Sequence, residues 1–227
     1  MHALVAAIHQ SFASHADAGN AAAMEAYLKG HFPFFGIKAA ERRALMQAQL
    51  KIHGKPLAEE VPALAAATFA LPEREMHQAG VDLLIKAARH LGRGHLPEVE
   101  ATISSKSWWD TVDALAVNVA GVILKRYPEE IPAWNDRWMD SGDMWLNRTA
   151  LLFQLKWKQD TDKVMLFSNI DRLAAHRDFF IRKAIGWSLR EYARTDPAAV
   201  SDFVASRSLS ALSEREALRG IERKQNS

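Results

Sequence analysis

Apolar residues recur at three- and four-residue spacing along most of the chain, with charged residues between them. The pattern is clearest over residues 73–91, 109–127, 146–158 and 180–194, and this spacing is typical of amphipathic α-helices. Ala, Leu, Arg, Lys and Glu, all strong helix formers, fill these segments. Since no segment alternates convincingly like a β-strand, the sequence predicts an all-α fold.

Proline and glycine interrupt the helical pattern at short intervals. The interruptions are Pro33, Gly36, Gly54, Pro56, Pro72, Gly92, Gly94 and Pro97, and Pro128, Pro132 and Pro197 lie near expected helix starts. Short connections favour antiparallel helix pairs, and serial pairs are typical of HEAT-type α-solenoids. We therefore expect residues 1–227 to form a single domain, a curved α-solenoid of HEAT-like repeats with a concave face suited to duplex DNA.

Composition excludes several kinds of site. The chain has no cysteine, so disulfides and thiolate metal sites are absent. The nine histidines form no His-Glu-x-x-His pattern, and we predict neither a metal nor a cofactor. Without a signal peptide or a membrane-length apolar run, we expect a soluble, cytoplasmic protein, associated with the nucleoid when it binds DNA.

Charge gives a mild indication of a nucleic-acid partner. The whole chain carries a formal charge of only +2, but residues 141–194 contain ten Lys/Arg and six Asp/Glu, an excess of +4. A basic segment of this kind is a weak electrostatic signature of DNA binding.

Two clusters contain charged residues within apolar helices. Asp113 precedes Ala114-Leu115-Ala116-Val117 and lies four residues after Trp109, so the two share a helix face. Burying a carboxylate there costs free energy unless it pairs with a cation or takes part in function. A buried ion pair and a functional role both remain open. Ser107 is expected to cap this helix, with Asp110 in its first turn. Arg148 is expected either to pair with an acid such as Asp143 or to contact a phosphate.

A third cluster mixes aromatic residues and cations on one helix face. Phe180, Lys183, Trp187, Arg190 and Arg194 follow one another at three- and four-residue steps. Aromatic rings could contact sugars or bases while cations neutralise phosphates. The alternative is ordinary packing, in which Lys and Arg stems cover apolar surface. Gly186 inside this helix indicates the close approach of a neighbouring helix.

Together these clusters resemble the AlkD-type DNA alkylation repair family over nearly the whole chain. The resemblance rests on separated motifs in the same order: His31-Phe32-Pro33-Phe34-Phe35-Gly36-Ile37, Glu41-Arg42-Arg43, Arg74-Glu75, Trp109 with Asp113, Arg148 five residues after Asp143, and the run from Phe180 to Tyr192. The stretch Met76-His77-Gln78 departs from the aromatic-rich sequence expected at that place.

The resemblance implies a monofunctional glycosylase, without metal or cofactor, that excises purines alkylated at N3 or N7 from duplex DNA and leaves an abasic site. It implies catalytic roles for Asp113, Trp109 and Trp187. Asp113 would stabilise an oxocarbenium-like transition state. We predict DNA contacts for Arg148, Phe180, Lys183, Arg190 and Lys156, and we expect a monomer. The alternative is a non-catalytic helical-repeat module that binds DNA structures or a protein.

Overall fold

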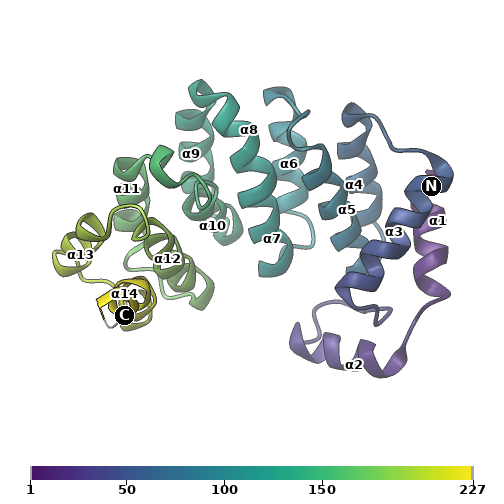
Figure 1. Ribbon diagram of the computed structural model, residues 1–227, viewed down its shortest axis with the longest axis horizontal. Helices are drawn as coiled ribbons and strands as arrows, with labels where there is room; N and C mark the ends of the chain where they lie inside the picture. The colour runs from purple at the N-terminus through teal and green to yellow at the C-terminus, as the bar shows by residue number, and fades with distance from the viewer. Residues whose placement is uncertain (1, 226–227) are drawn as a thin grey trace. The chain divides into compact units, whose positions relative to one another are not determined.

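The computed structural model describes residues 2–225, and these residues contain helices, turns and loops but no strand. The all-α prediction is therefore confirmed (Figure 1). The chain divides into two compact units, Met1–Lys106 and Ser107–Ser227. The expectation of one domain over residues 1–227 stays a prediction. Within the described part of the chain, no helix is both long and apolar enough to cross a membrane.

The first unit is a set of helices that pack against near neighbours in the sequence. Its elements are α1 (Ala3–Ala13), α2 (Ala18–Tyr27), α3 (Ala39–His53), a 3₁₀ turn (Ala58–Glu60), α4 (Val61–Phe69), α5 (Arg74–Ala87), a 3₁₀ turn (Arg93–His95) and α6 (Leu96–Ile103). Helix α1 packs on α3, and α4 packs on α5 and α6. Fully buried apolar side chains such as Ile8, Phe12, Met46 and Leu84 fill the space between them.

Buried charged groups fix the loop before α3. Glu75 is fully buried, and its carboxylate accepts backbone hydrogen bonds from Phe35, Gly36 and Ile37 at 2.8–3.1 Å. Gly36 has a φ of +90°, and a Cβ there would lie 2.0 Å from the Asp17 carbonyl oxygen. Glu75 thus holds the loop that contains the first sequence motif, together with Glu25, which accepts the Phe34 N–H at 3.1 Å. The loop requires glycine at position 36.

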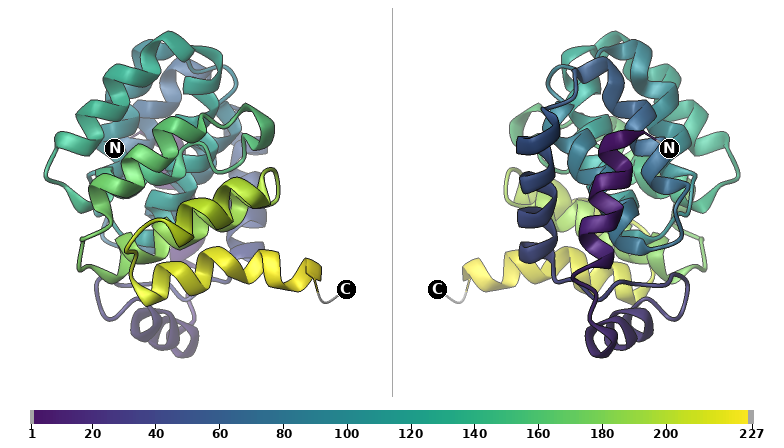
Figure 2. Two further views of the ribbon diagram at one scale, coloured as in Figure 1. Left: turned by 90° about the vertical axis from the view of Figure 1, so that its left-hand side faces the viewer. Right: turned by 90° about the vertical axis from the view of Figure 1, so that its right-hand side faces the viewer.

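The second unit is also a set of helices that pack against near neighbours in the sequence. Its elements are α7 (Trp109–Leu115), a π-helical turn (Ala116–Ala120), α8 (Gly121–Arg126), a 3₁₀ turn (Pro128–Glu130), α9 (Ile131–Asp140), α10 (Met144–Leu152), a 3₁₀ turn (Lys158–Asp160), α11 (Lys163–Leu173), α12 (Phe179–Tyr192), α13 (Pro197–Ala205) and α14 (Ala211–Gln225). Helix α10 packs on α7, α9 and α12, and α14 packs on α12 (Figures 1 and 2).

Aspartate side chains cap four helices of the second unit, α10 to α13. Asp143, Asp162, Asp178 and Asp196 each accept a backbone N–H of the first turn that follows, which satisfies a donor without a helical partner. The prolines expected near helix starts do lie in first turns. The predicted cap of α7 was wrong, because its N-cap is Trp108 and not Ser107.

Candidate functional site

The centre of the candidate site is an ion pair between α7 and α10. Arg148 Nε donates to Asp113 Oδ1 at 2.6 Å and Nη2 donates to Oδ2 at 2.8 Å. The Arg148 side chain is 5% exposed and that of Asp113 is 15% exposed. This bidentate geometry is the strongest form of a guanidinium–carboxylate contact. The acid that pairs with Arg148 is therefore Asp113, and the suggested partner Asp143 caps α10 instead.

Arg148 also joins the pair to α12. Its Nη1 donates to the backbone carbonyl of Phe180 in the first turn of α12. One guanidinium thus connects α7, α10 and α12 and fixes both oxygens of Asp113. The structure directs these Arg148 donors to protein groups, and a phosphate contact by Arg148 stays a prediction.

Burial determines the electrostatics of Asp113. Desolvation raises the pKa of Asp113 above its ordinary value of 3.8, and it outweighs the hydrogen bond and charge of Arg148, which lower it. The charge of Asp110, one turn earlier, raises this pKa further. A carboxylate with little water around it interacts more strongly with a nearby positive charge than one in bulk solvent.

Aromatic rings lie beside the ion pair. Trp108, Trp145 and Phe180 contact one another with ring centroids 5.0–5.6 Å apart, and Arg148 Cζ lies 6.0 Å from the centre of the Phe180 ring. The sequence patterns do not assign Trp108 and Trp145 to the site. The available signal was their spacing, since Trp108 adjoins Trp109 and Trp145 precedes Arg148 by three residues.

The two predicted catalytic tryptophans lie on two of the helices that Arg148 connects, α7 and α12. Trp109 is the first residue of α7, one turn before Asp113, and Trp187 is on α12, seven residues after Phe180. Both side chains are half-buried. Direct contacts join Asp113, Arg148 and Phe180. The Trp109 and Trp187 side chains are partly exposed to solvent on α7 and α12.

Lys183 and Arg190 are bound by an acid of the C-terminal helix. Lys183 Nζ lies 3.0 Å from Glu216 Oε1, and Arg190 Nη1 lies 2.6 Å from Glu216 Oε2. The Lys183 hydrogen bond is the main cause that lowers the pKa of Glu216 below its ordinary value of 4.5. The predicted close approach at Gly186 is confirmed, because a Cβ there would lie 2.5 Å from Glu216 Cβ and 2.9 Å from the Ser213 carbonyl oxygen.

Lys156 is exposed and lies beyond the end of α10. Its Nζ donates to Asn118 Oδ1 at 2.6 Å. Of the cations predicted to contact DNA, Lys156 has the most accessible side chain.

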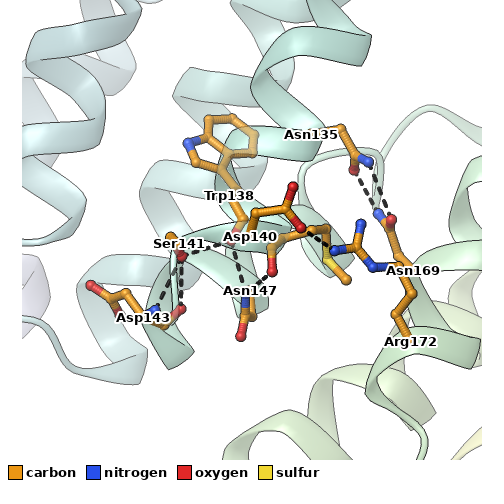
Figure 3. Close-up of polar contacts among 9 residues, drawn as sticks. Asn135, Trp138, Asp140, Ser141, Asp143, Asn147, Asn169 and Arg172 are labelled. Atoms are coloured by element: carbon orange, nitrogen blue, oxygen red, sulfur yellow. Dashed lines mark hydrogen bonds and ion pairs between the residues drawn. The ribbon is translucent and has the colours of Figure 1, made fainter.

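Amide side chains fix the start of α10, immediately before Arg148. Asn147 is buried, and its Nδ2 donates to the carbonyl oxygens of Trp138 (2.8 Å) and Met139 (3.1 Å) at the end of α9 (Figure 3). Asn135 and Asn169 exchange hydrogen bonds of 3.2 and 2.7 Å, which connect α9 to α11. The Asn147 bonds give partners to carbonyls at the end of α9, where helix carbonyls have no partner within the helix, and they hold α10, which carries Arg148, against α9.

Comparisons with known proteins agree with this architecture. Residues 8–221 match the sequence pattern of the DNA alkylation repair enzyme family. A solved structure described as a predicted DNA alkylation repair enzyme from Enterococcus faecalis is 32% identical, with a TM-score of 0.83 over 90% of this chain and 95% of that one. No protein with a curated description matches significantly. Because the family match covers most of the sequence, the chain belongs to the DNA alkylation repair enzyme family.

Proposed function

We propose that the protein is a monofunctional DNA glycosylase that removes cationic N3- or N7-alkylated purines from duplex DNA. The observation that carries the proposal is the state of Asp113: a largely desolvated carboxylate, oriented by Arg148, with 15% of its side chain still exposed. An ionised carboxylate has about four acceptor positions, and Arg148 uses two of them. The remaining positions are available to a substrate or a water molecule.

The chemistry follows from the charge of the damaged base. Alkylation at N3 or N7 gives the purine a formal positive charge. When the bond between C1′ and the base nitrogen breaks, its electron pair neutralises the base, and positive charge develops on the sugar as an oxocarbenium ion. The Asp113 carboxylate stabilises that charge electrostatically. Water then adds to C1′, and Asp113 orients the water or accepts its proton. The products are a free alkylpurine and an abasic site.

The aromatic and cationic residues around Asp113 have separate roles in this proposal. Trp109 and Trp187 face the deoxyribose, and their rings stabilise the developing cation through cation–π attraction. Phe180 packs against the nucleotide. Lys156 binds a backbone phosphate, which positions the DNA without reading its sequence. Arg148 acts mainly by orienting Asp113.

In this proposal Lys183 and Arg190 bind DNA by exchanging Glu216 for a phosphate. Both cations share the Glu216 carboxylate in the free protein. Phosphate and carboxylate bind Lys and Arg with similar hydrogen-bond geometry, so such an exchange preserves the bonding of both side chains.

A second candidate function is a non-catalytic module that binds damaged or distorted DNA. The bidentate Asp113–Arg148 pair favours this candidate, because a buried ion pair of this kind can serve only to hold two helices together. The two candidates differ in whether Asp113 meets the sugar of the damaged nucleotide.

Product analysis distinguishes the two candidates. The protein is incubated with a duplex that contains one N7-methylguanine, and the released base is identified by mass spectrometry. We expect free 7-methylguanine and a strand that breaks only after alkaline treatment, since the abasic site is left intact. DNA binding without base release, at enzyme in excess over DNA, would establish the binding module instead.

A further inference from the structure

The helix that carries Asp113 is interrupted by a π-helical turn directly after it. Helix α7 ends at Leu115, the π turn covers Ala116–Ala120, and α8 begins at Gly121, whose N–H donates to the Ala116 carbonyl five residues earlier. A π turn accommodates one extra residue within a helix, and such turns occur frequently at functional sites.

Both sides of the π turn make close contacts with α10 or its end. Before the turn, Asp113 binds Arg148. After it, Gly121 lies against the Phe153 carbonyl oxygen so closely that a Cβ would be 2.1 Å away, and the Gly121 carbonyl accepts a 3.2 Å bond from Trp157 Nε1. Both contacts require Asp113 and Gly121 to lie on the side of their helix that faces α10.

An uninterrupted α-helix does not place these two residues on the same side. Eight residues of α-helix make two full turns and a further rotation of about 80°. The extra residue of the π turn removes about 100° of rotation, so that Asp113 and Gly121 align to within about 20°. The π turn therefore makes the two contacts with α10 compatible.

The Asn118 side chain supports the π turn from within. Its Nδ2 donates to the Ala114 carbonyl oxygen at 2.9 Å, the acceptor that the backbone amide of residue 118 uses in a regular α-helix. Its Oδ1 accepts a 2.6 Å bond from Lys156 Nζ. One half-buried amide thus donates to the carbonyl of the residue after Asp113 and binds an exposed lysine.

We propose that the π turn sets the rotation of α7 that directs Asp113 to Arg148, and that Asn118 is a positioning residue for the reaction because its bond to Ala114 stabilises this turn. The expected effect on the excision rate rests on the proposed function. The effect on the orientation of Asp113 does not, because it is measurable without any substrate.

Three substitutions separate the two bonds of Asn118. Asn118→Leu keeps the approximate shape and removes both bonds. Asn118→Ser keeps a donor, since a serine hydroxyl bonds readily to the carbonyl four residues earlier, but it is too short to reach Lys156. Lys156→Met removes only the lysine bond. The readouts are the single-turnover excision rate for N7-methylguanine at saturating protein, the DNA dissociation constant, and the titration of Asp113 followed by carboxyl NMR.

We expect Asn118→Leu to lower the excision rate about tenfold below that of Lys156→Met, the factor that corresponds to one lost hydrogen bond. Its Asp113 should titrate at higher pH than in the original protein, because pairing with Arg148 weakens while Asp110 remains nearby. Asn118→Ser should restore most of both properties. If Asn118→Leu does not unfold cooperatively, Asn118→Ala replaces it.

The proposal is overturned if the Leu variant excises at the rate of Lys156→Met and its Asp113 titrates as in the original protein. If the unmodified protein releases no base, the proposed function fails by itself. The titrations of Asp113 in the three variants then still decide whether Asn118 positions it.

Discussion

Asp113 and Arg148 form a buried ion pair that connects α7 to α10. Each was conspicuous as a charged residue within an apolar helix, and burial of such a group requires a partner. Their pairing does not follow from the sequence, because they are 35 residues apart and helical spacing relates residues only within one helix. The same reason explains why Glu216 was not expected to bind Lys183 and Arg190, and why Arg148 was assigned to a phosphate.

The raised pKa of Asp113 predicts the pH dependence of excision. The ionised carboxylate is the active form, so the rate should increase with pH through the pKa of Asp113 and level off above it. Because burial raises this pKa, the midpoint should lie above the ordinary value of 3.8. Single-turnover rates at a series of pH values, corrected for spontaneous base loss, measure the midpoint.

Arg148→Lys provides the control for this pH profile. Lysine keeps the charge but loses the bidentate bond, so the midpoint should move further upward. A profile that is flat through the acidic range in the unmodified protein would remove Asp113 from the rate-determining step.

Gly121 predicts a stability effect at the junction of the π turn and α8. In Gly121→Ala the new Cβ would meet the Phe153 carbonyl oxygen, and we expect a loss of about 1–3 kcal/mol in the free energy of unfolding. Gly94→Ala is the matched control, because its Cβ would meet nothing within 4 Å. Urea denaturation of both variants measures the difference, and equal stabilities would contradict the close packing at Gly121.

At the scale of the helix, apolar periodicity predicted the elements well and their interruptions poorly. The expected helices over residues 73–91 and 180–194 correspond to α5 and α12, which are shorter by a few residues at the C-terminal end. The segment 109–127 was expected as one continuous helix and contains the π turn. Its residues Ala116, Val117, Val119 and Ala120 are apolar and suit either kind of turn, so only the contacts of Asp113 and Gly121 with α10 distinguish them.

The contact between α12 and α14 should weaken in acid. The pKa of Glu216 is lowered in the folded state, so its contribution to stability is present above its ordinary pKa of 4.5 and is lost as pH falls through the folded-state value. We expect Glu216→Gln to be less stable than the original protein at pH 7. The two proteins should converge in stability at low pH.

Thermal unfolding at several pH values tests this expectation. Asp202→Asn, on the exposed surface of α13, serves as a control for the general effect of removing an acid. A stability difference between Glu216→Gln and the original protein that is independent of pH would show that Glu216 acts by packing and not by charge.

For the molecule as a whole, charge predicts weak and local electrostatic attraction to DNA. The formal charge of +2 gives little long-range attraction, so affinity depends on individual cations that reach phosphates. Family membership supports a DNA substrate, while the alkyl group and the oligomeric state stay predictions. The all-α class followed from periodicity, whereas the curved, concave DNA-binding face was inferred from the repeat pattern and stays a prediction.

Lys156 predicts a measurable change in the salt dependence of binding. If Lys156 neutralises one phosphate, Lys156→Met should weaken binding to all duplexes alike and reduce the slope of log affinity against log salt by about 1. Lys125→Met is the control, because Lys125 Nζ lies 2.7 Å from Asp160 Oδ2. An unchanged slope in the Lys156 variant would exclude a phosphate contact at that position.

The most direct test of the account is the excision rate of Asp113→Asn. Asparagine has a similar shape but no charge, so we expect release of N7-methylguanine under single-turnover conditions to fall about 100- to 1000-fold, as when an electrostatic stabiliser is removed. The substitution also leaves Arg148 buried without its counter-ion, at a cost of about 3 kcal/mol, so rates are compared at a temperature where both proteins are folded. Excision by the folded variant at the original rate would contradict the central role of the Asp113 carboxylate.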